Sequence, residues 1–186
     1  MITVVSVNVL HAQVQFGVKA GLNLATLSYS GSAINDLKTK TDFNGGVFAS
    51  IPLFNSFYLQ PELLYSGQGS GTTDSGSGEI NYNYLNVPVL FKYQHASGLF
   101  AETGPQIGFL LSANVKAGSE TVDVKKDVQS TDFSWAFGLG YKFGNIGLGI
   151  DARYNLGLTN TLLAGNGETA KNSVFQIDLF YQFKSL

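Results

Sequence analysis

The chain has 186 residues, a length that suits a single domain. Its formal net charge of -2 argues against nucleic acid as a partner, and the absence of cysteine excludes disulfide bonds and thiolate metal sites. Charged residues make up only 13%, about half the usual share, and no apolar run approaches the roughly 18 residues of a transmembrane helix.

Residues 1–12 differ from the rest because they are apolar without alternation and end in Leu10-His11-Ala12. We interpret them as the remnant of a signal peptide, although the basic region that normally precedes the apolar stretch is missing. The alternative is an ordinary first strand. The first interpretation places the mature domain at residues 13–186.

From Gln13 onward, apolar and polar residues alternate with a period of two in eight segments. Each segment is close to the about 9 to 11 residues with which a tilted strand crosses a bilayer. The segments are 14–27, 43–53, 57–67, 81–93, 98–112, 132–143, 146–158 and 173–183.

The connections between the segments alternate in length. Short ones fall at 54–56, 94–97 and 144–145, and long ones at about 28–42, 68–80, 113–131 and 159–172. This layout predicts an all-β fold, an eight-stranded antiparallel up-and-down transmembrane β-barrel with short periplasmic turns and long extracellular loops. Both termini are then expected in the periplasm.

One hairpin predicts a register. If Gly144-Asn145 is a two-residue turn, Trp135 faces Tyr154 and Leu139 faces Ile150 on the apolar face. On the other face Arg153 meets Ala136, so a large polar side chain lies opposite a small one. A narrow barrel interior needs such pairs.

The apolar face also carries aromatic residues near both ends of the segments, as expected for the two aromatic belts of a membrane barrel. A β-sandwich core is the alternative, but it would leave a face with many charges in water. The belt toward the long loops comprises Tyr65, Phe109, Trp135, Tyr154 and Phe175, and the belt toward the short turns comprises Phe16, Phe57, Tyr93, Tyr141, Phe143, Tyr181 and Phe183.

Eight charged residues fall within the segments, and all of them lie on the face opposite the apolar stripe. Random placement would do this roughly once in 256 trials. Because an eight-stranded barrel is only just wide enough for side chains to fill it, we expect these charges to face the lumen and to pair with one another. A charged conduit is the alternative. The predicted lumen charges are Lys19, Glu62, Lys92, Glu102, Lys142, Asp151, Arg153 and Asp178.

Four motifs, in this order along the chain, give a resemblance to a known family. They are Gly17-Val18-Lys19-Ala20-Gly21-Leu22-Asn23-Leu24, Leu59-Gln60-Pro61-Glu62-Leu63-Leu64-Tyr65-Ser66-Gly67-Gln68-Gly69, Tyr84-Leu85-Asn86-Val87-Pro88-Val89-Leu90-Phe91-Lys92-Tyr93 and Gly104-Pro105-Gln106-Ile107-Gly108. The chain resembles the PorT-like "porin family" of small outer-membrane β-barrel proteins of Gram-negative bacteria.

The resemblance implies a location in the outer membrane and, as in some members, a role in protein secretion. The sequence departs from the family pattern in two places. Position 86 is Asn where the family often has Glu, and the chain ends in Phe183-Lys184-Ser185-Leu186 instead of an aromatic residue.

Catalysis, cofactors and metals are not expected. Of the two histidines, His11 would leave with the signal peptide and His95 lies in a short turn, so neither can serve a catalytic group at the outer rim. We expect Glu62 and Glu102 to be counter-ions of Lys92 or Arg153 and not an acid–base pair. The loop carboxylates, such as Asp74, lack the ligand spacing of a known calcium loop.

The leading hypothesis is a non-enzymatic, monomeric barrel in outer-membrane lipid, whose loops or rims contact envelope or secretion proteins. The second is a narrow channel for ions or small solutes. The third is a secreted lipocalin-like lipid carrier, which would need an apolar interior, the reverse of the pattern found here.

Overall fold

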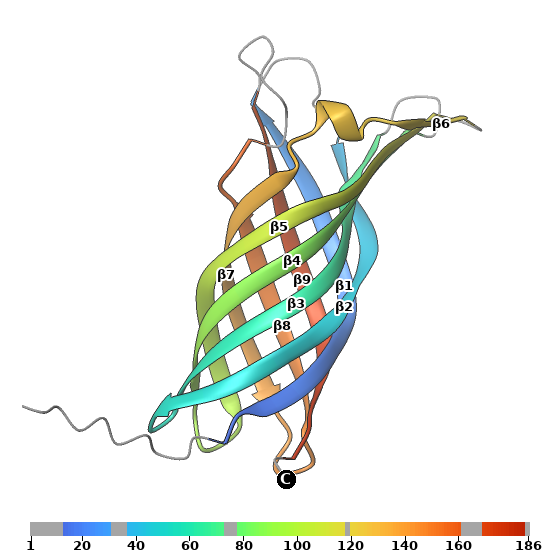
Figure 1. Cartoon of the computed structure of the whole chain (residues 1–186). Coiled ribbons are helices and arrows are strands. Elements are labelled where there is room, and N and C mark those ends of the chain that lie inside the picture. Colours follow the sequence, from blue (N-terminus) through green and yellow to red (C-terminus); the bar gives the residue numbers. More distant parts are fainter. Residues whose placement is uncertain (1–12, 31–36, 73–77, 118–119, 161–168, 185–186) are drawn as a thin grey trace, which may run out of the picture.

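The computed structural model describes residues 13–30, 37–72, 78–117, 120–160 and 169–184. Eight long strands form the wall of the barrel in Figure 1. They are β1 (Gln15–Ser30), β2 (Leu37–Phe54), β3 (Phe57–Thr72), β4 (Gly78–Gln94), β5 (Leu99–Ala117), β7 (Thr131–Lys142), β8 (Leu148–Gly157) and β9 (Thr169–Gln182).

Antiparallel pairing runs around the whole wall. The order is β4-β3-β2-β1-β9-β8-β7-β5, and the pairing of β4 with β5 closes the cylinder. Strand β1 pairs with both β2 and β9, so the first and last strands are neighbours. The predicted eight-stranded antiparallel barrel is thereby confirmed.

Six of the eight strands are longer than the sequence pattern indicated, mainly at the long-loop end, whereas β7 has the predicted length and β8 is shorter. Strand β2 begins at Leu37 and β5 continues to Ala117, so much of the chain predicted as loop is paired backbone. The side-chain alternation that defined the segments fades there, but backbone pairing does not depend on it.

The connection between β5 and β7 also contains regular structure. Strand β6 (Glu120–Asp123) pairs with the end of β5, and the 3₁₀-helix η1 (Lys125–Asp127) follows it. Figure 1 shows β6 projecting beyond the wall of the barrel.

The predicted register of the hairpin between β7 and β8 is wrong by two residues. Trp135 pairs with Leu156, Leu139 pairs with Ala152, and the Phe143 amide donates to the Leu148 carbonyl at 2.8 Å. The turn therefore spans residues 144–147, and its left-handed residues are Gly144 (φ +49) and Gly147 (φ +84). A two-residue turn of type I′ would need Asn145 in that conformation. Because the shift is even, no side chain changes face.

The two faces of the wall differ sharply in chemistry. Large apolar side chains such as Leu139, which is 65% exposed, cover the outside, while lysine, arginine, carboxylate and amide side chains are buried inside. The described residues contain no helix that is long and apolar enough to cross a membrane.

Candidate functional site

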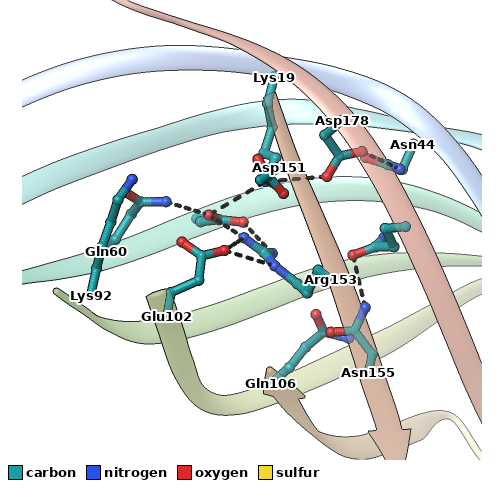
Figure 2. A network of polar contacts seen from close by, with 12 residues as sticks. Lys19, Asn44, Gln60, Lys92, Glu102, Gln106, Asp151, Arg153, Asn155 and Asp178 are labelled. Atoms are coloured by element: carbon teal, nitrogen blue, oxygen red, sulfur yellow. Dashed lines mark hydrogen bonds and ion pairs between the residues drawn. The ribbon is translucent and has the colours of Figure 1, made fainter. Parts of the chain in front are cut away.

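The charged residues predicted for the lumen come from seven of the eight barrel strands, all except β2. Seven are buried inside the barrel, and Lys142 is half-buried at the short-turn end of β7. Figure 2 shows most of the buried ones gathered in one network. The seven are Lys19, Glu62, Lys92, Glu102, Asp151, Arg153 and Asp178.

Arg153 on β8 is fully buried and holds two carboxylates, Glu62 from the opposite wall of the barrel and Glu102 from β5, on the far side of the adjacent strand β7. Its Nη1 and Nη2 donate to the two oxygens of Glu62 on β3 at 2.8 and 2.9 Å. Its Nε and Nη2 donate to Glu102 Oε1 on β5 at 3.1 and 2.5 Å. A guanidinium suits this role because its planar donors match two carboxylates at once. The contact with Glu62 spans the cross-section of the lumen.

Lys19 on β1 forms the second centre of the network. Its Nζ lies 3.0 Å from Asp151 Oδ2, 3.2 Å from Asp178 Oδ2 and 3.9 Å from Glu62 Oε1. Glu62 therefore joins the lysine and arginine centres. Burial of these charges costs desolvation free energy, which their partners of opposite sign offset.

Lys92 on β4 lies beside this network without an ion pair to any described carboxylate. Its Nζ donates to Gln60 Oε1 at 3.2 Å and lies 3.6 Å from the centre of the Phe100 ring. Gln60 in turn donates to Glu62 Oε1 at 2.8 Å. A cation–π contact and an amide bridge thus take the place of a direct counter-ion.

A layer of amides lies on the long-loop side of the charges. Asn23 donates to Ser66 Oγ at 2.9 Å, and its Oδ1 accepts hydrogen bonds from Asn44 and Gln176, each at 2.8 Å. Asn155 donates to Gln176 Oε1 at 2.8 Å. These bonds tie β1, β2, β3, β8 and β9 together across the interior.

Three phenylalanines fill the interior at the short-turn end, and sequence reasoning missed them. Phe48, Phe100 and Phe180 are buried, and Phe180 meets each of the other two edge-to-face, with ring centres 6.0 and 5.9 Å apart. Each ring occupies the space above a glycine on a neighbouring strand. Cβ atoms at Gly17, Gly140 and Gly149 would lie 2.2, 2.2 and 2.1 Å from the rings of Phe48, Phe100 and Phe180. A glycine on the inner face opposite an aromatic residue was the available signal.

A second apolar cluster lies at the long-loop end. Tyr82, Tyr84 and Leu110 of the barrel wall pack with Val128, which follows η1. The segment between β5 and β7 therefore contributes to the core at this end. From one end to the other, the interior is a sequence of apolar, amide, charged and aromatic layers.

The aromatic residues predicted for the two belts lie on the outer wall. All are exposed except Phe57 and Tyr65, which are half-buried. Trp135 Nε1 donates to Thr103 Oγ1 on the adjacent strand at 2.8 Å, which satisfies its one polar group. Their depth in the bilayer stays a prediction.

Within the described ranges, the structure brings Glu62 and Glu102 together as counter-ions of Arg153, and it gathers none of the other residues that were considered for catalysis or calcium. His95 lies in the turn after β4, where its Nδ1 is 2.9 Å from Ser97 Oγ. Glu62 and Glu102 share Arg153, as described above. Glu79, Glu120 and Asp123 are exposed, and His11 and Asp74 lie outside the described residues.

Comparison with solved structures finds similar barrels. Neisserial surface protein A aligns with a TM-score of 0.58 at 14% identity, over 90% of this chain and 97% of that one. OprG from Pseudomonas aeruginosa gives 0.52 at 11% identity, over 92% and 97%. Ail, the attachment invasion locus protein of Yersinia pestis, in complex with the heparin analogue sucrose octasulfate, gives 0.51 at 16% identity, over 92% and 99%.

At these identities the likeness shows the fold alone. No curated protein sequence matches the chain. The family profile described as "Outer membrane protein beta-barrel domain" matches residues 11–163, most of the chain. The chain therefore belongs to the outer membrane protein beta-barrel domain family, whose members are located in the outer membrane.

Proposed function

We propose that this protein is a non-enzymatic outer-membrane barrel with a filled lumen, which acts through its loops and rims on other components of the envelope. The observation that carries the proposal is the contact of Arg153 with Glu62, which crosses the lumen from β8 to β3. The aromatic layer of Phe48, Phe100 and Phe180 adds a second obstruction. A filled interior leaves the rims and loops as the surfaces available for binding.

The resemblance to the PorT-like family narrows the proposal to an accessory role in secretion. Such a role needs a rigid wall that presents loops to one side of the membrane and turns to the other. The buried network supplies rigidity because it links strands that are distant along the wall.

A narrow channel is the second candidate, and one observation favours it. Buried polar atoms of the lumen, among them Glu102 Oε2, Gln106 Oε1 and Asn155 Oδ1, lack a hydrogen-bond partner within the described structure. Buried polar atoms of this kind normally bind water. A lipocalin-like carrier is not favoured, because the interior is polar and the apolar side chains face outward.

Conductance in planar lipid bilayers separates the first two candidates. We expect the purified protein to give no stable openings, because side chains fill the cross-section of the lumen. A large porin reconstituted in the same way is the control for insertion. Stable, ion-selective openings that change in the Arg153→Ala variant would establish the channel and contradict the filled lumen.

The proposed orientation places the short turns and both termini in the periplasm. The chain has no cysteine, so a single introduced cysteine reports its own side of the membrane. In intact cells, a membrane-impermeant thiol reagent should label Val122→Cys on β6 but not Ser97→Cys in the turn after β4. Both variants should be labelled after the outer membrane is permeabilised. Labelling of Ser97→Cys in intact cells would reverse the orientation.

A further inference from the structure

The sequence stretches that form the short-turn end of the barrel contain no acidic side chain. The sequence contains no Asp or Glu in residues 43–61, 80–101, 133–150 and 179–186. The first three stretches each contain one short turn, and the fourth is the end of the chain. The long-loop end is mixed instead, with Asp42, Glu79 and Asp123 beside Lys40 and Lys125. The charged side chains in the four short-turn stretches are therefore all lysines, namely Lys92, Lys142 and Lys184.

Lys142 is the last residue of β7 at this end. Two hollows of about 260 and about 300 Å³ share Lys142 and Asn145 in their linings, and the smaller one also includes Lys184. Lys142 is half-buried and has no ion pair with any carboxylate of the described residues. A partly desolvated ammonium without a counter-ion attracts an anion more strongly than a fully hydrated one.

The neutral groups around Lys142 suit a peptide. The hollows are lined by amides and hydroxyls, including Gln15, Gln94, Ser97 and Gln182. Gln182 Nε2 donates to Gln15 Oε1 at 2.7 Å, so this amide pair is fixed in place. An amide both donates and accepts hydrogen bonds, as a peptide group does.

The direction of Lys142 argues against lipid as the anion. Its neighbours Tyr141 and Phe143 are exposed on the outer wall, and alternation places Lys142 on the opposite face, toward the mouth of the barrel. Lipid headgroups surround the outer wall. An anion that binds Lys142 would therefore approach from the aqueous side of the membrane. A peptide segment of a soluble or membrane-anchored protein can do so.

We propose that the short-turn rim, centred on Lys142 and Lys184, binds an acidic peptide segment of an envelope protein. This inference rests on the proposed function, in which the protein acts through its loops and rims. It specifies that the periplasmic rim is the binding surface and that the partners carry carboxylates. Attraction between the rim and the segment would increase the association rate and would weaken with salt.

The test uses the full chain in nanodiscs of zwitterionic lipid and a fluorescent poly-glutamate peptide, with anisotropy as the measurement. We expect saturable binding that weakens with rising salt, and no binding of a glutamine peptide of equal length. The double variant Lys142→Gln/Lys184→Gln should bind about tenfold more weakly. The matched control is Lys125→Gln/Lys126→Gln, which removes the same charge at the other end and should bind like the parent protein.

Three results would overturn the inference. The first is that the folded parent protein does not bind the peptide, and the second is that both double variants lose peptide binding equally. The third is that, in discs that contain anionic lipid, the parent protein retains this lipid and Lys142→Gln/Lys184→Gln does not. Each leaves the filled lumen and the orientation intact, because conductance and thiol labelling test those separately.

Discussion

Replacing Arg153 with methionine is expected to destabilise the folded barrel by about 3 to 5 kcal/mol. The change removes the partner of Glu62 and Glu102 and leaves two buried carboxylates close together. The free energy of unfolding can be measured by denaturant titration in lipid vesicles. Trp135 is the only tryptophan and lies on the outer wall, so its fluorescence reports the loss of the lipid environment.

Two comparisons separate the lost ion pairs from the lost volume. Lys142→Met makes the same kind of substitution at a half-buried lysine without an ion pair in the described structure, and it should cost less than about 1 kcal/mol. Adding Glu62→Gln and Glu102→Gln to Arg153→Met should restore much of the stability, because neutral amides need no counter-ion. Similar losses in Arg153→Met and Lys142→Met would contradict the network.

The interior shows how a narrow barrel can hold long side chains. Arg153 lies opposite Gly138, and Asp151 lies opposite Gly140. A Cβ atom at Gly138 would lie 2.8 Å from Glu102 Cγ, so the missing side chain is what allows Glu102 to reach Arg153. Glycine on the inner face thus gives space to the charges and to the three phenylalanines alike.

Alternation of side chains was sufficient to predict the wall of the barrel. The period of two fixes the face of every residue in a strand, so Asp151 and Arg153 could be assigned to the face opposite Ile150 and Ala152 before any partner was known. The number of strands followed from the number of alternating segments. Both inferences use only residues that are neighbours in the sequence. They therefore did not require knowledge of which strands pair to close the barrel.

Contacts across the lumen could not be predicted in the same way. Arg153 and Glu62 are 91 residues apart and meet only because β1 pairs with β9 and β4 with β5. The hairpin register depended on backbone angles at Gly144 and Gly147, which composition does not reveal. The layer of phenylalanines broke the rule that apolar side chains face outward, and only the opposing glycines marked it.

Replacing Leu139 with arginine is expected to reduce the ratio of folded to unfolded protein in vesicles by about 30- to 1000-fold. Leu139 is 65% exposed on the outer wall and lies midway between Trp135 and Phe143. An arginine on the lipid face costs about 2 to 4 kcal/mol near the middle of the bilayer and little near its surface. The folded fraction can be measured by the shift in gel mobility between unheated and heated samples.

The matched control is Val122→Arg, which also places arginine at an exposed apolar residue of a strand. Val122 is 56% exposed on β6, beyond the end of the barrel wall, where water can hydrate the guanidinium. It should fold into vesicles as the parent protein does. Equal folding of Leu139→Arg and Val122→Arg would mean that the outer wall around Leu139 does not face lipid. The apolar wall would then have to be covered by protein, which the monomeric barrel proposed here does not provide.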